Sequence, residues 1–255
     1  TGEITDQLYG ENNPSDNSGI LKYVRIEYAG YAFLPDKEIN GLTFGGVGNG
    51  TTVDHVQVSY ANDDSFEWFG GTVNCSHLIA YKGLDDDFDT DNGFSGKIQF
   101  GIGVRDPQVA DVSGSNTFES DNDANGTTTL PQTGAIFSNM TIIGPIQSTA
   151  TATNAGNINS LFQHGAQIRR NSSISIFNSV IMGYPLAGLF IDATKGNPTD
   201  LNIANGQLIF QNNIIAGCTV PLKYGASTSA PTGFTTAALQ TWFDGGANSI
   251  LNYGS

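Results

Sequence analysis

The fold is decided by three segments that align without gaps: KYVRIEYAG at residues 22–30, DHVQVSYAN at residues 54–62 and CSHLIAYKG at residues 75–83. One aligned position holds tyrosine each time, and another holds a β-branched residue: Tyr28, Tyr60 and Tyr81, and Ile26, Val58 and Ile79. Each segment ends at Gly or Asn, the residue types that best tolerate positive φ. Short apolar runs closed by such residues predict β-strands.

A second set of repeats lies further along the chain: FSNMTIIG at residues 137–144, IFNSVIMG at residues 176–183 and FQNNIIAG at residues 210–217. Aligned on the final Gly, these segments share three positions: Asn139, Asn178 and Asn212; Ile142, Ile181 and Ile215; and Phe137, Ile176 and Phe210. We expect the isoleucines to point inward and the asparagines to lie in turns at coil corners. There, stacked amides could form a hydrogen-bonded ladder.

The strands recur about 20–40 residues apart without helical patterns between them. A parallel α/β sheet would need a helical crossover for each strand pair. A β-propeller would need four similar strands per repeat. Stacked coils need neither, so the repeats predict an all-β, right-handed parallel β-helix that spans residues 1–255 as one domain. The one fair helix candidate is residues 235–243, where Ala238, Leu239, Trp242 and Phe243 could share a face.

Three stretches carry a family resemblance: GLTFGGVGNGTTVDHVQVSY at residues 41–60, DDFDTDNG at residues 86–93 and GSNTFESDNDA at residues 114–124. On these residues the chain resembles right-handed parallel β-helix proteins of the pectin-lyase-like type. More narrowly, it resembles secreted or surface proteins of a largely uncharacterised Gram-negative bacterial group. The resemblance covers residues 10–145 best. It implies export from the cell, but no particular activity, because a fold does not fix a function.

The charge, the apolar runs and the cysteine count exclude several classes of protein. The net charge is −14, from 24 acids and 10 bases, and only Arg169 and Arg170 are adjacent bases, so nucleic acid is not an expected partner. No apolar run is long enough for a transmembrane segment. Two cysteines, Cys75 and Cys218, exclude a disulfide scaffold and are expected to be separate core thiols. The chain begins at Thr1, and we expect it to be a mature or trimmed part of a longer chain.

Two acidic clusters could hold calcium, which takes six to eight oxygen ligands in irregular geometry. The first cluster runs from Asp85 to Asp91. The second, Asp121-x-Asp123-x-Asn125-Gly126, matches the first half of an EF-hand loop but has Gln132 in place of the twelfth-position Glu. The alternatives are a solvated acidic loop and an ordinary turn. The predicted calcium ligands are Asp85, Asp87, Asp89, Asp91, Asp121, Asp123 and Asn125.

If the chain is an enzyme, its catalytic residues are expected among Arg105, Asp63 and Asp64. β-Helix lyases pair a carboxylate-held calcium with an Arg or Lys base, and glycosidases use two carboxylates. Glycosidases of this fold usually show Asn-x-Asp, Gly-His-Gly and Arg-x-Lys signatures. Here Gln163-His164-Gly165 is the nearest fragment, and no matching Arg-x-Lys follows. The alternative for Arg105 is a structural ion pair. The three histidines, His55, His77 and His164, are too dispersed for a zinc signature.

A glycan contact is predicted at Phe66, Glu67, Trp68 and Phe69, where aromatic residues adjoin acids just after a strand. Aromatic rings could stack on sugar faces. The alternative is that this coil turn packs onto the core.

Three function classes remain open. The first is a non-catalytic secreted or cell-surface protein for adhesion, glycan binding or surface assembly, with an extracellular glycan or surface protein as partner. Missing catalytic signatures favour it. The second is a calcium-dependent polysaccharide lyase or a glycosidase, which a groove lined by Arg105 and the Asp cluster would favour. The third is a structural segment of a larger solenoid or filament, which uncapped ends would favour.

Overall fold

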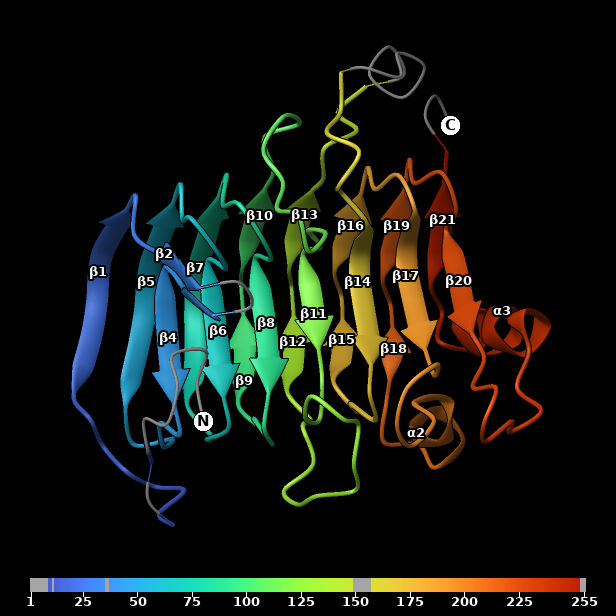
Figure 1. Cartoon of the computed structure of the whole chain (residues 1–255), viewed down its shortest axis with the longest axis horizontal. Coiled ribbons are helices and arrows are strands. Elements are labelled where there is room, and N and C mark those ends of the chain that lie inside the picture. Colours follow the sequence, from blue (N-terminus) through green and yellow to red (C-terminus); the bar gives the residue numbers. More distant parts are fainter. Residues whose placement is uncertain (1–8, 11, 35–36, 149–156, 253–255) are drawn as a thin grey trace.

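The chain folds as a parallel β-helix, in which short strands of successive coils stack on one another (Figure 1). The computed structural model describes residues 9–10, 12–34, 37–148 and 157–252. Within these residues, the strands of the two large sheets pair in parallel, with each coil hydrogen-bonded to the next. The predicted fold class is confirmed.

The larger sheet has twelve strands, and later coils contribute two short strands each. They are β1 (Ile20–Glu27), β5 (Thr52–Ser59), β7 (Asn74–Tyr81), β9 (Lys97–Gln99), β10 (Ile102–Val104), β12 (Ile136–Ser138), β13 (Thr141–Ile143), β15 (Ser175–Phe177), β16 (Val180–Met182), β18 (Phe210–Gln211), β19 (Ile214–Ala216) and β21 (Ser249–Leu251).

The smaller sheet has seven strands and faces the larger one across the core. They are β4 (Leu42–Gly45), β6 (Phe66–Phe69), β8 (Phe88–Asp91), β11 (Phe118–Ser120), β14 (His164–Arg169), β17 (Ala187–Asp192) and β20 (Leu222–Gly225). An unpredicted antiparallel hairpin, β2 (Tyr31–Leu34) with β3 (Lys37–Ile39), is inserted between β1 and β4. Two helices are described, α2 (Asp200–Ala204) and α3 (Thr236–Gly245).

Each coil of the larger sheet bends at one residue with left-handed backbone. Positive φ values of 51–62° recur in register at this corner: Tyr23, His55, His77, Phe100, Asn139, Asn178, Asn212 and Ala247. The bend interrupts the two-residue alternation of the strand, so Val53, Val56 and Val58 all point inward and are buried.

The corner explains why the three asparagines occupy the same position in their repeats. Their predicted place at coil corners is confirmed, and the backbone N–H groups of Asn139 and Asn178 donate to carbonyls of the next coil at 3.1 Å. The predicted ladder of side-chain amides is wrong: it is not among the hydrogen bonds of the described residues, and Asn178 and Asn212 are exposed. Asparagine fits here because it adopts the left-handed conformation more readily than most residues.

A substitution at the corner tests this explanation. Asn178→Ala should lower the free energy of unfolding by about 1 kcal/mol, because alanine pays the full steric cost of a positive φ. Asn178→Gly, which adopts that conformation freely, is the matched control and should be much less destabilised. The measurement is the urea denaturation midpoint of each variant. Equal midpoints for the alanine and glycine variants would contradict the explanation.

The third repeat is displaced by one residue from the predicted alignment. Asp54 pairs with Ser76 rather than with Cys75, and Tyr81 lies opposite Ser59 rather than Tyr60. The physical reason is burial, because Cys75 takes the inward place next to Val53. The alignment of the first two repeats is confirmed, and Tyr28 stacks on Tyr60 with ring centroids 5.0 Å apart.

Equivalent side chains of successive coils form the core. Phe66, Phe88 and Phe118 stack along the smaller sheet with ring centroids 5.7 and 5.6 Å apart. Ile142, Ile181 and Ile215 are fully buried on the larger sheet, as predicted. Each such side chain contributes about 1.5–3 kcal/mol of burial free energy.

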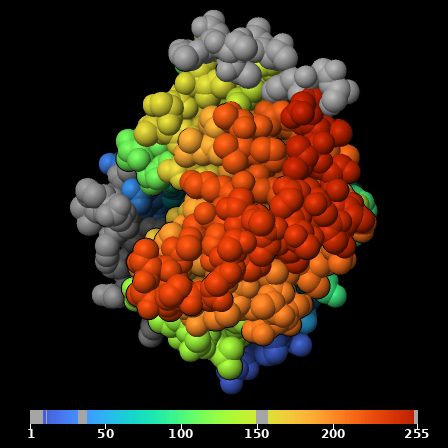
Figure 2. Space-filling view, turned by 90° about the vertical axis from the view of Figure 1, so that its right-hand side faces the viewer, coloured from blue at the N-terminus to red at the C-terminus, as the bar shows by residue number. Residues whose placement is uncertain are grey.

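Figure 2 shows the C-terminal end of the coil stack, where the residues coloured orange to red gather. Helix α3 lies there, close to the predicted residues 235–243, and the hydroxyl of Thr235 caps it by accepting from the Ala238 N–H. Leu239 and Phe243 are its buried residues, and Phe243 stacks on Phe210 of β18 at 5.8 Å.

Cys75 is buried and Cys218 is partly buried. Both cysteines are free thiols, as predicted. Among the described residues, no helix has the length and apolar character needed to cross a membrane.

Candidate functional site

An acidic cleft opens on the outer face of the smaller sheet, where β6, β8 and β11 begin. Its volume is about 640 Å³. The cleft brings together acids from consecutive coils and two arginines from β14 and the turn that follows it. It is lined by Glu38, Asp63, Asp64, Glu67, Asp85, Asp86, Asp89, Asp111, Val112, Ser113, Gly114, Glu119, Gln163, Arg169 and Arg170.

Strand register places the acids above one another. Glu67 pairs with Asp89, and Asp89 with Glu119, so one outward row of the sheet carries three consecutive carboxylates. The neighbouring row is inward and holds the stacked phenylalanines, as strand alternation requires. Asp64 and Asp86 lie 22 residues apart, which is also the spacing of Glu67 and Asp89 and the length of one coil.

The carboxylates form three overlapping triads. In each triad, the three ligand oxygens lie within 4.8 Å of one another. Asp64 belongs to two triads, and so does Asp89. The triads are Asp63, Asp64 and Asp85; Asp64, Glu67 and Asp89; and Asp86, Asp89 and Glu119.

This crowding disfavours the ionised form of the acids. Burial raises the pKa of Asp64, Asp86 and Asp89 well above the usual range, and neighbouring carboxylates raise it further. Burial also raises the pKa of Asp85 to about 6. It raises the pKa of Glu119 to about 7, although the nearby cation of Arg169 opposes the shift.

Several oxygens of the cleft are fixed by the backbone, and two lack a partner. An oxygen of Asp64 accepts the Asp86 N–H at 2.8 Å, and an oxygen of Asp86 accepts the Asn116 N–H. Among the described residues, Oδ1 of Asp85 and Oδ1 of Asp89 are buried and accept no hydrogen bond. Buried polar atoms are normally satisfied, so these oxygens are suited to an added ligand. A hard cation such as calcium takes oxygen ligands of this kind.

A family model described as a pectate-lyase-like beta helix domain matches residues 1–250, nearly the whole chain. The chain belongs to this family. The predicted likeness to pectin-lyase-like β-helices is therefore confirmed. No curated protein and no solved structure matches the sequence.

The acids predicted as a possible catalytic pair, Asp63 and Asp64, lie in the acidic cleft of this β-helix domain, but Arg105 does not. Arg105 is fully buried and donates from Nη1 to Oδ1 of Asp87 at 2.8 Å and from Nη2 to the Leu84 carbonyl at 3.2 Å. The side chains of Arg105 and Asp87 pair inside the core, and this burial does not fit the catalytic role considered for Arg105 or the calcium role predicted for Asp87. The structural ion pair was the alternative.

The aromatic glycan contact is also corrected. Phe66, Trp68 and Phe69 are buried, at 0%, 0% and 3% exposure, and the Trp68 ring lies between Phe44 and Phe94. All four residues of β6 are buried, so none of its aromatic rings has a solvent-exposed face on which a sugar could stack. Glu67, the acid in the same segment, lies in the cleft.

The second predicted calcium cluster is not assembled around one point. Asp121 forms ion pairs with Arg169 and Arg170 at 2.8 and 2.5 Å. Oδ1 of Asp123 accepts the Asn125 N–H at 2.8 Å, so the loop is closed by its own hydrogen bonds. This arrangement favours the alternative, an ordinary turn.

Of the first cluster, Asp85 and Asp89 line the cleft, whereas Asp91 does not. The sequence prediction missed Asp86, Glu119, Arg169 and Arg170. The 22-residue recurrence of acids was the signal that could have found Asp86. Nothing in local sequence placed Arg169 beside Glu119, with which it forms an ion pair.

Proposed function

We propose that this β-helix domain is a secreted or cell-surface binding protein that holds calcium in the acidic cleft and, through the ion, binds an acidic polysaccharide. The observation that carries the proposal is the set of three overlapping carboxylate triads, each with oxygens within 4.8 Å. Asp64 and Asp89, which the triads share, are the central residues of the proposed ion site.

Calcium suits this site better than smaller cations do. It accepts six to eight oxygens in irregular geometry, whereas magnesium demands a near-ideal octahedron and retains its waters. The cleft offers carboxylates from three consecutive coils, and their positions are set by the strand register rather than by one loop. Burial is the main cause of the raised pKa values of Asp64, Asp86 and Asp89, and repulsion between the carboxylates adds to it; a bound ion would offset that repulsion.

The ligand class follows from the charge of the cleft. With Trp68 in the core, a neutral glycan has no aromatic platform there, because the lining residues among the described part of the chain include no ring. An acidic polymer would be repelled by a chain of net charge −14 unless calcium bridges it. Arg169 and Arg170 add positive charge on one side of the cleft.

Binding without cleavage is the form of this function that the residues favour. A lyase needs a base beside the ion, and Arg105 lies in the core. Burial lowers the pKa of Arg169, but Glu119 and Asp121 outweigh burial and the net shift is upward. A guanidinium held in ion pairs with two carboxylates is a poor proton acceptor.

Glycoside hydrolysis in the same cleft is the second candidate. One observation favours it: the pKa of Glu119 is raised to about 7, which is suited to a general acid, and other carboxylates lie close by. Growth into an open filament is less favoured, because α3 packs through Phe243 on Phe210 of β18, which ends the strand order of the larger sheet.

The test is calcium-dependent binding. Isothermal titration of the chelated protein with calcium should give saturable binding that is weakened at least tenfold in Asp64→Asn and Asp89→Asn. Asp123→Asn, which alters a carboxylate outside the cleft, is the matched control and should bind as the unmodified protein does. Retention of a polyuronate such as polygalacturonate should require calcium and be lost in Asp89→Asn.

Product analysis separates the candidates. We expect no new reducing ends and no unsaturated ends after incubation with polygalacturonate and calcium. New reducing ends that are abolished by Glu119→Gln would establish hydrolysis instead. Unaltered calcium affinity in both Asp64→Asn and Asp89→Asn would contradict the proposed site.

A further inference from the structure

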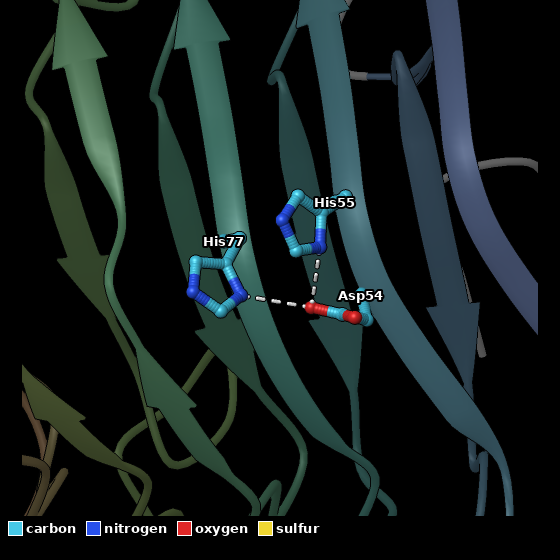
Figure 3. Close-up of side chains that lie close together, drawn as sticks. All are labelled: Asp54, His55 and His77. Carbon is cyan, nitrogen blue, oxygen red and sulfur yellow. Dashed lines mark hydrogen bonds and ion pairs between the residues drawn. The ribbon is translucent and has the colours of Figure 1, made fainter.

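A second cluster of ligating side chains lies on the larger sheet, on the coil corner rather than in the acidic cleft. His55 of β5 and His77 of β7 both point toward Asp54 (Figure 3). The Nδ1 atoms of His55 and His77 lie 2.9 and 2.8 Å from Oδ1 of Asp54. One ligand atom from each residue lies within 4.8 Å of the others.

The coil geometry, rather than local sequence, brings the two imidazoles together. His55 and His77 occupy the left-handed corner of adjacent coils, with φ of 55° and 54°, and their flanking residues pair in register. Their rings stack with centroids 4.3 Å apart and planes 21° apart. Both Nδ1 atoms therefore face the same side, where Asp54 precedes the corner.

We propose that Asp54, His55 and His77 bind a divalent transition-metal ion of the zinc type. Two imidazole nitrogens and one carboxylate oxygen are the donor set that such ions prefer, whereas calcium prefers oxygen alone. The side chains of His55 and His77 are 43% and 46% exposed. A fourth ligand from solvent or from a bound molecule can therefore reach the ion.

The surrounding contacts orient the carboxylate. The Oγ–H of Ser76 donates to Oδ1 of Asp54 at 2.8 Å, and Lys22 Nζ lies 3.1 Å from Oδ2. Together with the two imidazoles, these contacts hold the carboxylate with Oδ1 toward both histidines. The Lys22 ammonium competes with a metal ion for the same negative charge.

Ring stacking alone does not account for the cluster. Tyr23 and Phe100 occupy the same corner on the outer sides of the pair. The Tyr23 ring packs at a tilt against His55, with centroids 4.8 Å apart, and Phe100 stacks on His77 at 5.1 Å. The column can thus be filled by rings that have no metal-binding atom. His55 and His77 differ from these two rings because each has an Nδ1 atom, a possible metal ligand, directed at Oδ1 of Asp54.

The column also supplies matched substitutions. Asparagine occupies this corner in three later coils, so His55→Asn and His77→Asn retain a residue that adopts the left-handed conformation. Phe100→Asn removes a ring at the same corner without removing a ligand and is the control. Lys22→Gln removes the competing ammonium and should increase the affinity for zinc severalfold.

The experiment is titration of the full chain with zinc ions, with calcium present in excess to occupy the acidic cleft. Zinc affinity should fall at least tenfold in His55→Asn and in His77→Asn and remain within twofold in Phe100→Asn. The three histidines of the chain can be followed individually by ¹⁵N NMR. Zinc should shift the ring nitrogens of His55 and His77 but not those of buried His164.

The proposal would be overturned by no zinc binding at millimolar concentration, by unchanged affinity in the folded His77→Asn protein, or by a zinc response that leaves the His55 and His77 signals unmoved. Loss of zinc binding in Asp89→Asn but not in His77→Asn would assign the ion to the acidic cleft and would equally overturn it.

Discussion

Replacing Arg105 by alanine should lower the free energy of unfolding by about 3–5 kcal/mol, because it leaves the Asp87 carboxylate buried without its cation. Both side chains are 0% exposed, and the guanidinium also donates to the Leu84 carbonyl and lies over the Phe162 ring. The measurement is urea denaturation of the two proteins. An unchanged midpoint in Arg105→Ala would contradict this structural role.

A double variant separates charge from packing. Arg105→Met combined with Asp87→Leu removes both charges and replaces them with apolar side chains, so it should be less destabilised than Arg105→Ala. Calcium binding in the cleft should persist in the double variant, because neither residue lines the cleft. Loss of calcium binding in a folded double variant would mean that Arg105 and Asp87 act in the cleft after all.

The chelated protein should lose stability as the pH rises from about 5 to 8. Burial raises the pKa of Glu119 to about 7 and that of Asp85 to about 6. In the unfolded chain, such groups titrate near pH 4. Between these values the native state binds more protons than the unfolded state, so the free energy of unfolding falls as the pH rises. The shift of Glu119 alone corresponds to about 3 kcal/mol.

Calcium should reverse this loss if, as proposed, it binds the ionised carboxylates of the native state. At a concentration 100 times its Kd, it adds about 2.7 kcal/mol, or about 5–10 °C in Tm for a chain of this length. The effect should be large at pH 7.5 and small at pH 5. Thermal melts with calcium and with chelator at both pH values measure it.

The variants Asp64→Asn and Asp89→Asn sharpen the test, because each removes one of the crowded charges. In chelator at pH 7.5 they should be more stable than the unmodified protein, and calcium should stabilise them less. If the free energy of unfolding in chelator rises between pH 5 and 8, the native state does not raise the pKa of the cleft carboxylates, and the account is wrong.

The repeats were sufficient to predict the coil. Asn139, Asn178 and Asn212 marked the corner, and Ile142, Ile181 and Ile215 marked the inward face, because both features recur once per coil. Register was predicted less well. The left-handed corner breaks the two-residue alternation, and a gapless alignment cannot tell whether Cys75 or Ser76 points inward.

The cleft was predicted only in part. Asp85 and Asp89 stood out as acids in a short run, but the same run contains Asp87, which points into the core toward Arg105. Local sequence gives no sign that the side chain of Asp87 points inward while those of Asp85 and Asp89 line the cleft. Glu119 and Arg169 come from later coils, and only stacking brings them next to Asp89 or to each other.

The aromatic prediction failed for a related reason. Alternating acids and rings in β6 suggested an exposed platform, but the outward row holds Glu67 while Phe66 and Trp68 fill the coil interior. The three histidines are too dispersed in the sequence for a zinc signature, yet His55 and His77 are 22 residues, or one coil, apart, and their ring centroids lie 4.3 Å from each other.

The location of calcium in a crystal grown with the ion tests the central claim most directly. We expect an anomalous-scattering peak in the acidic cleft within about 2.3–2.6 Å of carboxylate oxygens from Asp64 and Asp89. The same crystals of Asp89→Asn should lack it. A cleft without an ion at millimolar calcium, or a peak only at the Asp123 turn, would contradict the account.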